Sequence, residues 1–303
     1  MTQTPIRKRW QNVDGVLLLD KPGGLSSNDA LQKVRRLFSA AKAGHTGTLD
    51  PMATGLLPLC FGEATKFSNR LLEADKTYEA VMRLGQTTTT GDAEGEILRE
   101  RPVDVSEAAL DAMELRFWGE IEQIPPMHSA LKHQGRALYE YARAGIEIER
   151  EKRRVVIISL DIQWRNGNDV AFSVRCSKGT YVRTLAEDMG EALGCGAHLI
   201  ALRRTAIGEL DVQSAHTLEA LTEIDESQRG TLLAPPDALL AHLPAVNLDE
   251  QGVQRIMHGQ PTMLPCAAGE VRMYGGEGNF LGLGLADGAG GLKPVRLLAS
   301  QAG

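Results

Sequence analysis

The sequence predicts an α+β fold in two parts: a large domain over residues 1–245, in which helices flank a mixed or antiparallel sheet, and a small β-rich domain over residues 246–303. The chain has 303 residues, more than a typical single domain, and 43% of them are hydrophobic, which is enough for a substantial core. Apolar runs that predict strands are interspersed with helical patterns through the first part. Beyond residue 246, short strand patterns are separated by glycine-rich turns, so the tail is predicted to be mostly β.

The first predicted strand covers residues 16–19 and ends in the turn residues 20–24. A helix is predicted to follow it, with Ser27 or Asn28 as its N-cap. The apolar residues of this helix fall on one face: Leu31, Val34, Leu37 and Phe38.

Residues 77–84 alternate between apolar and polar side chains, which predicts a half-buried strand. One side of that strand carries Tyr78, Ala80, Met82 and Leu84. Residues 155–160 and 170–176 also have strand patterns. These segments supply the predicted sheet of the larger domain.

The strand 170–176 leads through a short polar turn into a predicted helix that ends at Gly194. Its apolar stripe consists of Val182, Leu185, Ala186, Met189 and Leu193. Tyr181 and Arg183 therefore belong to the first helical turn after a strand, a position that presents side chains at a sheet edge or a cleft.

Residues 44–55 contain three glycines, several threonines and Pro51 around a single carboxylate, Asp50. Glycine supplies positive φ angles and proline lacks a backbone donor, so this segment is predicted to be a shaped loop. Functional side chains are often mounted on such loops. By itself, Asp50 could equally be a turn residue that stabilises the loop before a proline.

Several classes of function are excluded by what the sequence lacks. The four cysteines are scattered and form neither a zinc-binding pattern nor a disulfide framework, so we expect no metal site. No phosphate-binding glycine motif precedes a helix, and we expect no cofactor. The first ten residues are polar and basic, without the apolar stretch of a secretory signal, and no apolar run approaches the ~20 residues that cross a bilayer. The sequence predicts a cytoplasmic protein that does not bind membranes.

The net charge of −6 is unevenly distributed. Residues 1–50 carry eight Lys and Arg against four Asp, whereas residues 216–250 carry seven acidic residues against one arginine. Further basic clusters occur at 150–154 and at Arg203-Arg204. Because exposed charges are screened beyond ~10 Å in 0.1 M salt, a polyanion responds to such local clusters. They are compatible with an RNA-binding surface, although each alone could be an ordinary solvated face.

Six segments together resemble, in sequence and in order, the bacterial tRNA pseudouridine-55 synthases of the TruB family. They are residues 14–27, 44–55, 75–78, 123–130, 176–185 and 202–204. The resemblance covers roughly the first 210 residues and is weaker beyond them. It implies the pseudouridine synthase fold and isomerisation of uridine-55 in the T-arm (TΨC loop) of tRNA to pseudouridine, by base flipping, with an aspartate nucleophile and no cofactor.

The resemblance also implies roles for individual residues. Asp50 matches the nucleophile, and Tyr78 matches a tyrosine that stacks on the target uracil and is a candidate for moving the C5 proton. Arg183 matches the arginine that pairs with the aspartate, and an opposite charge within ~4–6 Å lowers an Asp pKa by about 1–3 units. Tyr181 and Leu202 match further residues of the substrate pocket.

Lys21, together with the following proline, is expected to shape the floor of the pocket. His45 matches a histidine that takes the place of the flipped base in the RNA stack, since an aromatic stack of about 1–3 kcal/mol offsets part of the flipping cost. Residues 123–154 resemble a mobile RNA-binding insertion, in which His128 stands where relatives often have an aromatic residue. The tail resembles a PUA-type RNA-binding domain.

In isolation, these residues have simpler explanations. Tyr78 and Leu202 could be core residues, Arg183 a brace on a helix face, and His45 a hydrogen-bonded turn residue. Two other functions also remain open: an RNA-binding or tRNA-folding module whose catalysis is lost, and a related synthase with another RNA target. The expected partner is the T-arm of tRNA, the expected state is a monomer, and no obligatory protein partner is expected.

Overall fold

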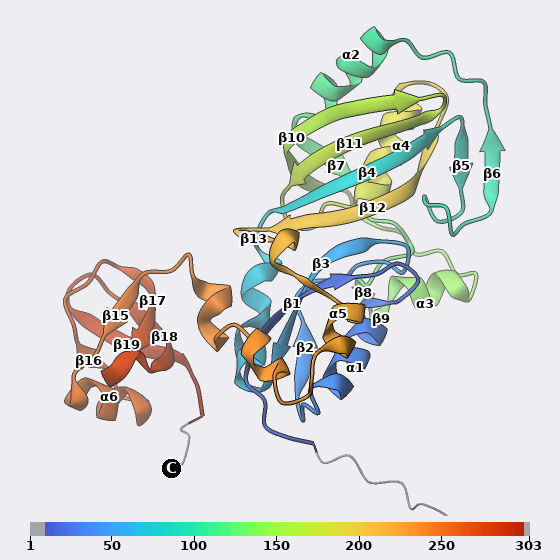
Figure 1. Cartoon of the computed structure of the whole chain (residues 1–303). Helices are drawn as coiled ribbons and strands as arrows, with labels where there is room; N and C mark the ends of the chain where they lie inside the picture. The colour runs from blue at the N-terminus through green and yellow to red at the C-terminus, as the bar shows by residue number, and fades with distance from the viewer. Residues whose placement is uncertain (1–9, 300–303) are drawn as a thin grey trace, which may run out of the picture.

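The computed structural model describes residues 10–299, which form a body around one large sheet and a smaller β lobe at the C-terminal end (Figure 1). The strands of the large sheet are β1 (Gly15–Lys21), β2 (Ala43–His45), β3 (Thr54–Phe61), β4 (Lys76–Leu84), β7 (Gly119–Gln123), β10 (Arg153–Asn166), β11 (Asp169–Cys176), β12 (Ala197–Ile207), β13 (Leu210–Asp211) and β14 (His216–Thr217). Their order is β14-β1-β3-β12-β4-β11-β10-β7, with β2 paired to β3 and β13 to β12.

The sheet is mixed. β1 pairs in parallel with β14 and β3 with β12, while the other pairs along this order are antiparallel. Helices pack on it, so the predicted α+β class is confirmed. Each strand predicted from apolar patterning forms, and the apolar run 155–160 is the start of the longer strand β10.

The α-helices are α1 (Ser27–Leu37), α2 (Glu107–Phe117), α3 (Leu138–Arg143), α4 (Val182–Ala192), α5 (Leu218–Glu223) and α6 (Glu250–Met257), and 3-10 helices, the longest of them Gly62–Leu72, lie between elements. α2 contacts β10 and α4 contacts β12, so both cover the upper part of the sheet in Figure 1. The apolar stripe predicted for α4 is buried at Val182, Leu185, Ala186 and Met189, and Gly194 follows the helix with φ 82°.

The N-cap predicted for α1 is wrong by one residue or more. Ser26 is the N-cap, and its side chain accepts a hydrogen bond from the backbone N–H of Asp29 (3.1 Å). Ser27 is buried instead, and its hydroxyl bonds both the N–H (2.8 Å) and the carbonyl (3.0 Å) of Leu49. Sequence propensity cannot separate two adjacent serines when one of them is needed for a tertiary contact. The consequence is that α1 is tied to the loop that carries Asp50.

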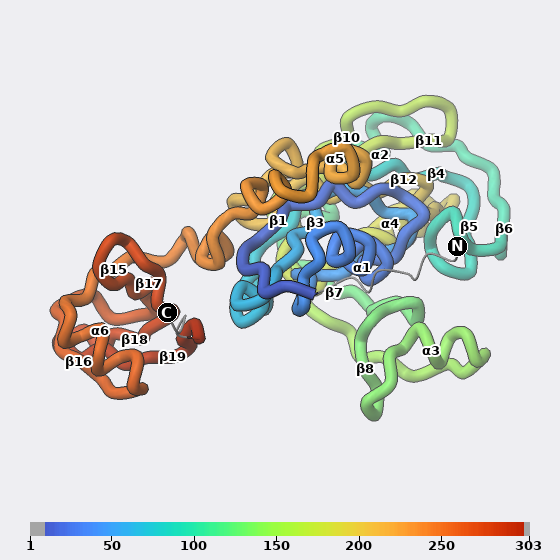
Figure 2. The backbone as a smooth tube through the Cα atoms, turned by 60° about the horizontal axis from the view of Figure 1, so that its bottom comes forward, coloured from blue at the N-terminus to red at the C-terminus, as the bar shows by residue number. Residues whose placement is uncertain are grey.

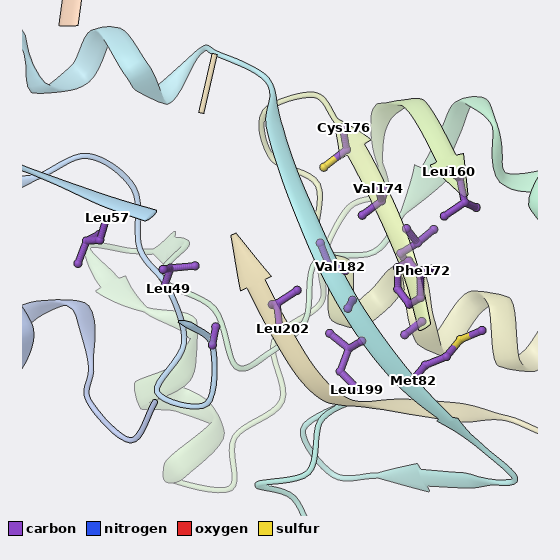
Figure 3. Close-up of a cluster of buried hydrophobic side chains, with 14 of the residues drawn as sticks. Leu49, Leu57, Met82, Leu160, Phe172, Val174, Cys176, Val182, Leu199 and Leu202 are labelled. Atoms are coloured by element: carbon purple, nitrogen blue, oxygen red, sulfur yellow. The ribbon is translucent and has the colours of Figure 1, made fainter. Parts of the chain in front are cut away.

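The main core lies between the large sheet and its helices. Figure 3 shows part of it, in which Met82 of β4, Phe172 of β11, Leu199 of β12 and Val182 of α4 belong to one buried cluster. Leu202, at the end of this cluster, is 8% exposed and continues the apolar wall toward the Asp50 loop. The core thus ends where the candidate site begins.

The C-terminal lobe contains a second sheet in the order β15-β17-β18-β19-β16. Its strands are β15 (Ala245–Asn247), β16 (Thr262–Met263), β17 (Gly269–Tyr274), β18 (Phe280–Ala286) and β19 (Gly291–Leu297). The glycine-rich tail forms the expected turns, but Gly282 lies inside β18, where a Cβ would come within 2.2 Å of the Arg296 carbonyl oxygen. Close approach of two strands therefore requires this glycine.

One apolar cluster joins this lobe to the body of the protein. Phe280 and Leu283 of β18 belong to the same buried cluster as Val16 and Leu56 of the central sheet. Phe67, on the 3-10 helix Gly62–Leu72, also packs against Phe280, with ring centroids 5.7 Å apart. The two sheets are separate, but part of the hydrophobic core is common to both.

Between β7 and β10 the chain leaves the sheet and forms an arm with a short hairpin, β8 (Lys132–His133) and β9 (Arg136–Ala137), followed by α3 (Figure 2). A second hairpin, β5 (Gln86–Thr88) and β6 (Ile97–Glu100), follows β4. In the part of the chain that the structure describes, no helix is both long and apolar enough to cross a membrane.

Candidate active site

Asp50 lies in the loop between β2 and β3, and buried contacts fix that loop from two sides. Ser27 holds the backbone of Leu49, as described above. From the other side, the Lys21 ammonium donates to the carbonyls of Leu25 (2.7 Å), Pro22 (2.9 Å) and Pro51 (3.4 Å). At Gly55 (φ 99°) a Cβ would lie 2.2 Å from the carbonyl oxygen of Arg204, so the loop can join β3 here only with glycine.

Lys21 is fully buried and lines neither of the cavities beside Asp50. Burial lowers its pKa to about 8, while the charge of Asp50 opposes that shift. Because the Lys21 side chain has no exposed surface, the expectation that it shapes the floor of the pocket rests on its bonds to the loop carbonyls and not on a contact with substrate.

Arg183, on the first turn of α4, forms an ion pair with Asp50 in which Nε lies 3.1 Å from Oδ2. The arginine side chain is only 6% exposed, whereas the Asp50 side chain is 35% exposed. The structure therefore brings together the carboxylate and the guanidinium that the sequence motifs singled out. The buried partner is the cation, and the carboxylate faces open space.

Three further acceptors hold Arg183, and one of them is a carboxylate that the sequence analysis missed. Nη1 donates to Asp92 Oδ2 (3.1 Å) and to the Thr90 carbonyl (3.0 Å), and Nη2 donates to the His128 carbonyl (2.6 Å). Asp92 is 2% exposed. Its only sequence signal is its place in the polar turn after the strand 77–84, which resembles an ordinary loop. Arg183 thus spans two carboxylates, Asp50 and Asp92.

Arg183 favours the ionised form of Asp50, as expected, but the net pKa of Asp50 is still raised. Burial raises the pKa of Asp50, and this effect outweighs the opposing attraction of Arg183. The negative charge of Asp92 raises it further. Sequence comparison identifies the cation but says nothing of how much water the carboxylate loses, and desolvation is the larger effect here.

Two adjoining cavities open on Asp50. The smaller, of about 320 Å³, is lined by Tyr78, Tyr181, Leu202 and the buried Arg204, among others. The larger, of about 470 Å³, is lined by His45 together with the N-terminal end of α1 and residues of α3. Both share a common wall: Thr48, Leu49, Asp50, His128, Ser129, Ala130 and Arg183. Of the residues predicted for the site, all except Lys21 line one cavity or the other.

Tyr78 and Arg204 form the far side of the smaller cavity. Burial raises the pKa of Tyr78, and hydrogen bonding and the positive charge of Arg204 oppose this. The Arg204 side chain is 1% exposed and donates from Nε to the Leu56 carbonyl (2.8 Å). The prediction that Arg203-Arg204 belongs to a basic surface is therefore wrong for Arg204. Arg203 forms a bidentate ion pair with Asp20 (2.7 and 3.0 Å), which neutralises it.

Tyr181 is the N-cap residue of α4, and a buried glutamine fixes its backbone. Gln123 accepts from the Tyr181 N–H (3.1 Å) and donates to the Tyr181 carbonyl (3.3 Å). Burial raises the pKa of the Tyr181 phenol, so it is neutral near pH 7. Leu202 of β12 supplies an apolar surface of the same cavity, as expected.

His45 ends β2 and lines the larger cavity. Burial lowers its pKa, an effect that a backbone hydrogen bond at Gly47 opposes, and the neutral imidazole is favoured. A neutral ring stacks on a base without bringing an additional charge. Among the described residues, no group of three or more His, Cys, Asp or Glu side chains has the arrangement of a metal site.

Comparison with known proteins identifies the family to which this chain belongs. Three family models match this chain: TruB family pseudouridylate synthase, N-terminal domain (residues 35–182), tRNA pseudouridylate synthase B C-terminal domain (183–241), and Pseudouridine synthase II TruB, C-terminal (244–298). The tRNA pseudouridine synthase B of Azoarcus sp. is 59% identical over 292 residues, covering 96% of this chain and 97% of the relative. That of Dechloromonas aromatica is 56% identical over 293 residues, covering 96% and 98%.

Among solved structures, a chain of a Cbf5-Nop10-Gar1 complex superposes with a TM-score of 0.68 at 30% identity, covering 90% of this chain and 78% of that chain. The sequence matches extend along nearly the whole chain, including the C-terminal lobe. The chain therefore belongs to the TruB family of tRNA pseudouridine synthases, which are isomerases.

Proposed function

We propose that this protein converts uridine-55 in the T-arm of tRNA to pseudouridine, with Asp50 as the nucleophile. The observation that carries the proposal is the accessible carboxylate of Asp50, ion-paired to a buried arginine where two cavities meet. The reaction breaks the bond between N1 of uracil and C1′ of the ribose, rotates the base, and joins C5 to C1′. A proton leaves C5 and one is gained at N1, so no redox partner is consumed.

In this proposal the smaller cavity holds the flipped uracil, because an aromatic ring, an apolar wall and the nucleophile converge there. Tyr78 stacks on the base, and Leu202 packs against it. Arg183 holds the Asp50 carboxylate in place and stabilises its ionised form against the desolvation that favours protonation. Asp50 either adds to the base or assists cleavage of the glycosidic bond, and both routes need this ionised form.

Tyr78 is the proposed group for the C5 proton. Its phenol is neutral in the free protein, because burial raises its pKa. Arg204 supplies the positive charge that stabilises a transient phenolate, and it also bonds the backbone of the Asp50 loop at Thr48 and Gly47 (both 3.4 Å). The larger cavity places His45 where it can occupy the gap that the flipped base leaves in the RNA stack.

We further propose that residues 123–154 form an RNA-binding insertion and that residues 246–303 form a PUA-like RNA-binding domain appended to a catalytic domain of residues 1–245. The insertion carries two aromatic and guanidinium pairs: Arg136 lies 4.8 Å from the ring of the half-buried Tyr141, and Arg143 lies 5.4 Å from the ring of the exposed Tyr139. Tyr139 and Arg143 also line the larger cavity. Because the substrate is tRNA, we place the protein in the cytoplasm, and we propose that it acts as a monomer.

The test is to incubate the purified protein with an unmodified tRNA transcript, without added cofactor, and to map pseudouridine along the product. Pseudouridine at position 55 alone is expected, and a transcript with cytidine at position 55 is the matched control. Modification elsewhere would indicate a related synthase with another target. Tight binding without any turnover would indicate an RNA-binding module instead.

A further inference from the structure

Glu187 lies on α4 one helical turn after Arg183, so the two side chains share a face of the helix. Its carboxyl group packs against Gly91: a Cβ added to Gly91 would lie 2.8 Å from Glu187 Cδ and 2.9 and 3.0 Å from the two carboxyl oxygens. Gly91 has φ 74°, in the left-handed region that favours glycine. The missing side chain at Gly91 leaves the space that the Glu187 carboxyl fills.

The residues on either side of Gly91 hold the catalytic cation. Arg183 Nη1 donates to the Thr90 carbonyl (3.0 Å) and to Asp92 Oδ2 (3.1 Å). On the far side of the turn, the Gly91 carbonyl accepts from the N–H of Leu199 in β12 (3.0 Å). The turn is therefore held between the central sheet and the Glu187 carboxyl.

We propose that Glu187 is a positioning residue for the isomerisation: its carboxyl, packed on Gly91, sets the turn that holds Arg183 against Asp50, and its charge decides how strongly Arg183 is drawn away from Asp50. This inference rests on the proposed role of Asp50 as the nucleophile. It concerns a residue that touches neither cavity and acts only through Arg183.

The charged groups that face Glu187 are Arg183, Asp188 and Glu191 on its own helix and Asp92 on the turn. Burial, and after it the charge of Asp188, raises the pKa of Glu187 to about 7. Below that pH the carboxyl is neutral, and Asp50 and Asp92 alone share the charge of Arg183. Above it, a third carboxylate competes for the same cation. The Arg183 interaction with Asp50 therefore weakens as pH rises through neutrality.

The experiment measures single-turnover pseudouridine formation by the full-length protein with excess enzyme, from about pH 6 to about pH 8.5, in wild type and in Glu187→Gln. Glutamine has nearly the shape of the protonated acid and stays neutral. The ratio of the Glu187→Gln rate to the wild-type rate should rise about three- to tenfold across this range, the size expected of one competing charge near a partly buried pair. Taking the ratio cancels every titration that the two proteins share.

Two variants serve as comparisons. Asp169→Asn removes a carboxylate of β11 that pairs at the surface with Arg83 (2.7 Å) and does not face Glu187, so its rate ratio to wild type should stay constant with pH. Asp188→Asn leaves Glu187 in place but removes a neighbouring negative charge, so the fall in rate should move to lower pH. The dissociation constant for tRNA should remain within about twofold of wild type in all three variants, because none of these residues lines either cavity beside Asp50.

A Glu187→Gln ratio that does not change with pH would overturn the proposal, as would an Asp188→Asn profile that coincides with wild type. A parallel loss of tRNA binding and turnover in Glu187→Gln would also overturn it, because positioning acts on the rate alone. Failure of wild type to form pseudouridine at any pH would instead refute the proposed function, so the two failures are distinguishable.

Discussion

Replacement of Asp92 by asparagine should slow pseudouridine formation by about 10- to 100-fold and leave tRNA binding within about twofold of wild type. Asp92 gives Arg183 its second carboxylate, at 3.1 Å, in a place where both side chains are almost fully buried. A hydrogen bond to a charged group is worth about 1.5–3 kcal/mol, and each ~1.4 kcal/mol of transition-state stabilisation is a factor of ten in rate. A loss of about 3 kcal/mol, the upper end of this range, is not expected, because asparagine keeps one acceptor oxygen and the carbonyls of Thr90 and His128 still accept from Arg183.

The same substitution should move the acid limb of the pH profile to lower pH. The negative charge of Asp92 raises the pKa of Asp50, so removing it favours the ionised nucleophile at lower pH. A slower enzyme with a more acidic profile is an unusual combination. Damage to the fold would also expose Asp50 and lower its pKa, so a thermal melt must show that the variant is folded before this combination is assigned to loss of Arg183 orientation.

The assay is single-turnover kinetics with excess enzyme across pH, with filter binding of tRNA and a thermal melt to establish that the variant is folded. Asp169→Asn is the matched control, because Asp169 pairs with Arg83 at the surface (2.7 Å), where such pairs contribute at most about 1 kcal/mol to stability. A wild-type rate in Asp92→Asn, or an acid limb that moves to higher pH, would refute the role assigned to Asp92.

Four other predictions follow from the site and its surroundings. Asp50→Asn should bind tRNA nearly normally but form no pseudouridine, and measurable turnover would remove Asp50 from the nucleophile role. Tyr78→Phe should keep binding and lose turnover in the same assay, whereas Tyr78→Leu should lose both; full activity of the phenylalanine variant would exclude the hydroxyl from proton transfer. Limited proteolysis should cut residues 123–154 first and tRNA should protect them, so equal cleavage with and without tRNA contradicts an RNA-binding insertion. Lys293→Gln with Arg296→Gln should flatten the log–log salt dependence of tRNA binding by about one to two units, with turnover at saturating tRNA unchanged, and an unaltered slope would show that β19 makes no phosphate contact.

Sequence patterning predicted the helices and strands in which the core-facing side chains recur at the period of that helix or strand. Strand alternation along 77–84 and the apolar stripe of α4 depend on which side of one element faces the core, and a single segment carries that information. The loop around Asp50 was likewise predictable, because its glycines and proline restrict the backbone locally.

The features that the sequence did not reveal depend on contacts between distant segments. Asp92 acquires its role only because β12 and α4 place the 90–92 turn beside Arg183, which lies 91 positions away in the chain. Arg204 resembled a surface charge beside Arg203, yet strand alternation turns adjacent residues to opposite faces of the sheet and buries one of them. The choice of Ser26 over Ser27 as N-cap also depends on a partner, Leu49, in another segment.

The shared apolar cluster limits how the C-terminal part can be tested. Removing residues 246–303 would expose the surfaces that Phe280 and Leu283 cover on the central sheet, and burial of one such side chain is worth about 1.5–3 kcal/mol. A loss of activity on truncation would therefore mix lost RNA contacts with lost stability. Charge substitutions on β19 avoid this, because Lys293 and Arg296 are exposed and outside the cluster.

The protonation state of Asp50, the proposed nucleophile, is set by a balance that no single residue controls. Burial disfavours the ionised form of Asp50, and the charge of Arg183 is the largest effect that opposes burial. Arg183 opposes the effect of burial only while it is held beside Asp50. Its other acceptors come from the 90–92 turn and from His128 in the segment that follows β7. That segment also walls both cavities, so RNA that moves it also moves an acceptor of Arg183. If the arm binds RNA as proposed, this binding changes the ionisation of Asp50. The acidic pKa in the pH profile of kcat/KM, which reports the free enzyme, should then differ from that of kcat, which reports the tRNA complex.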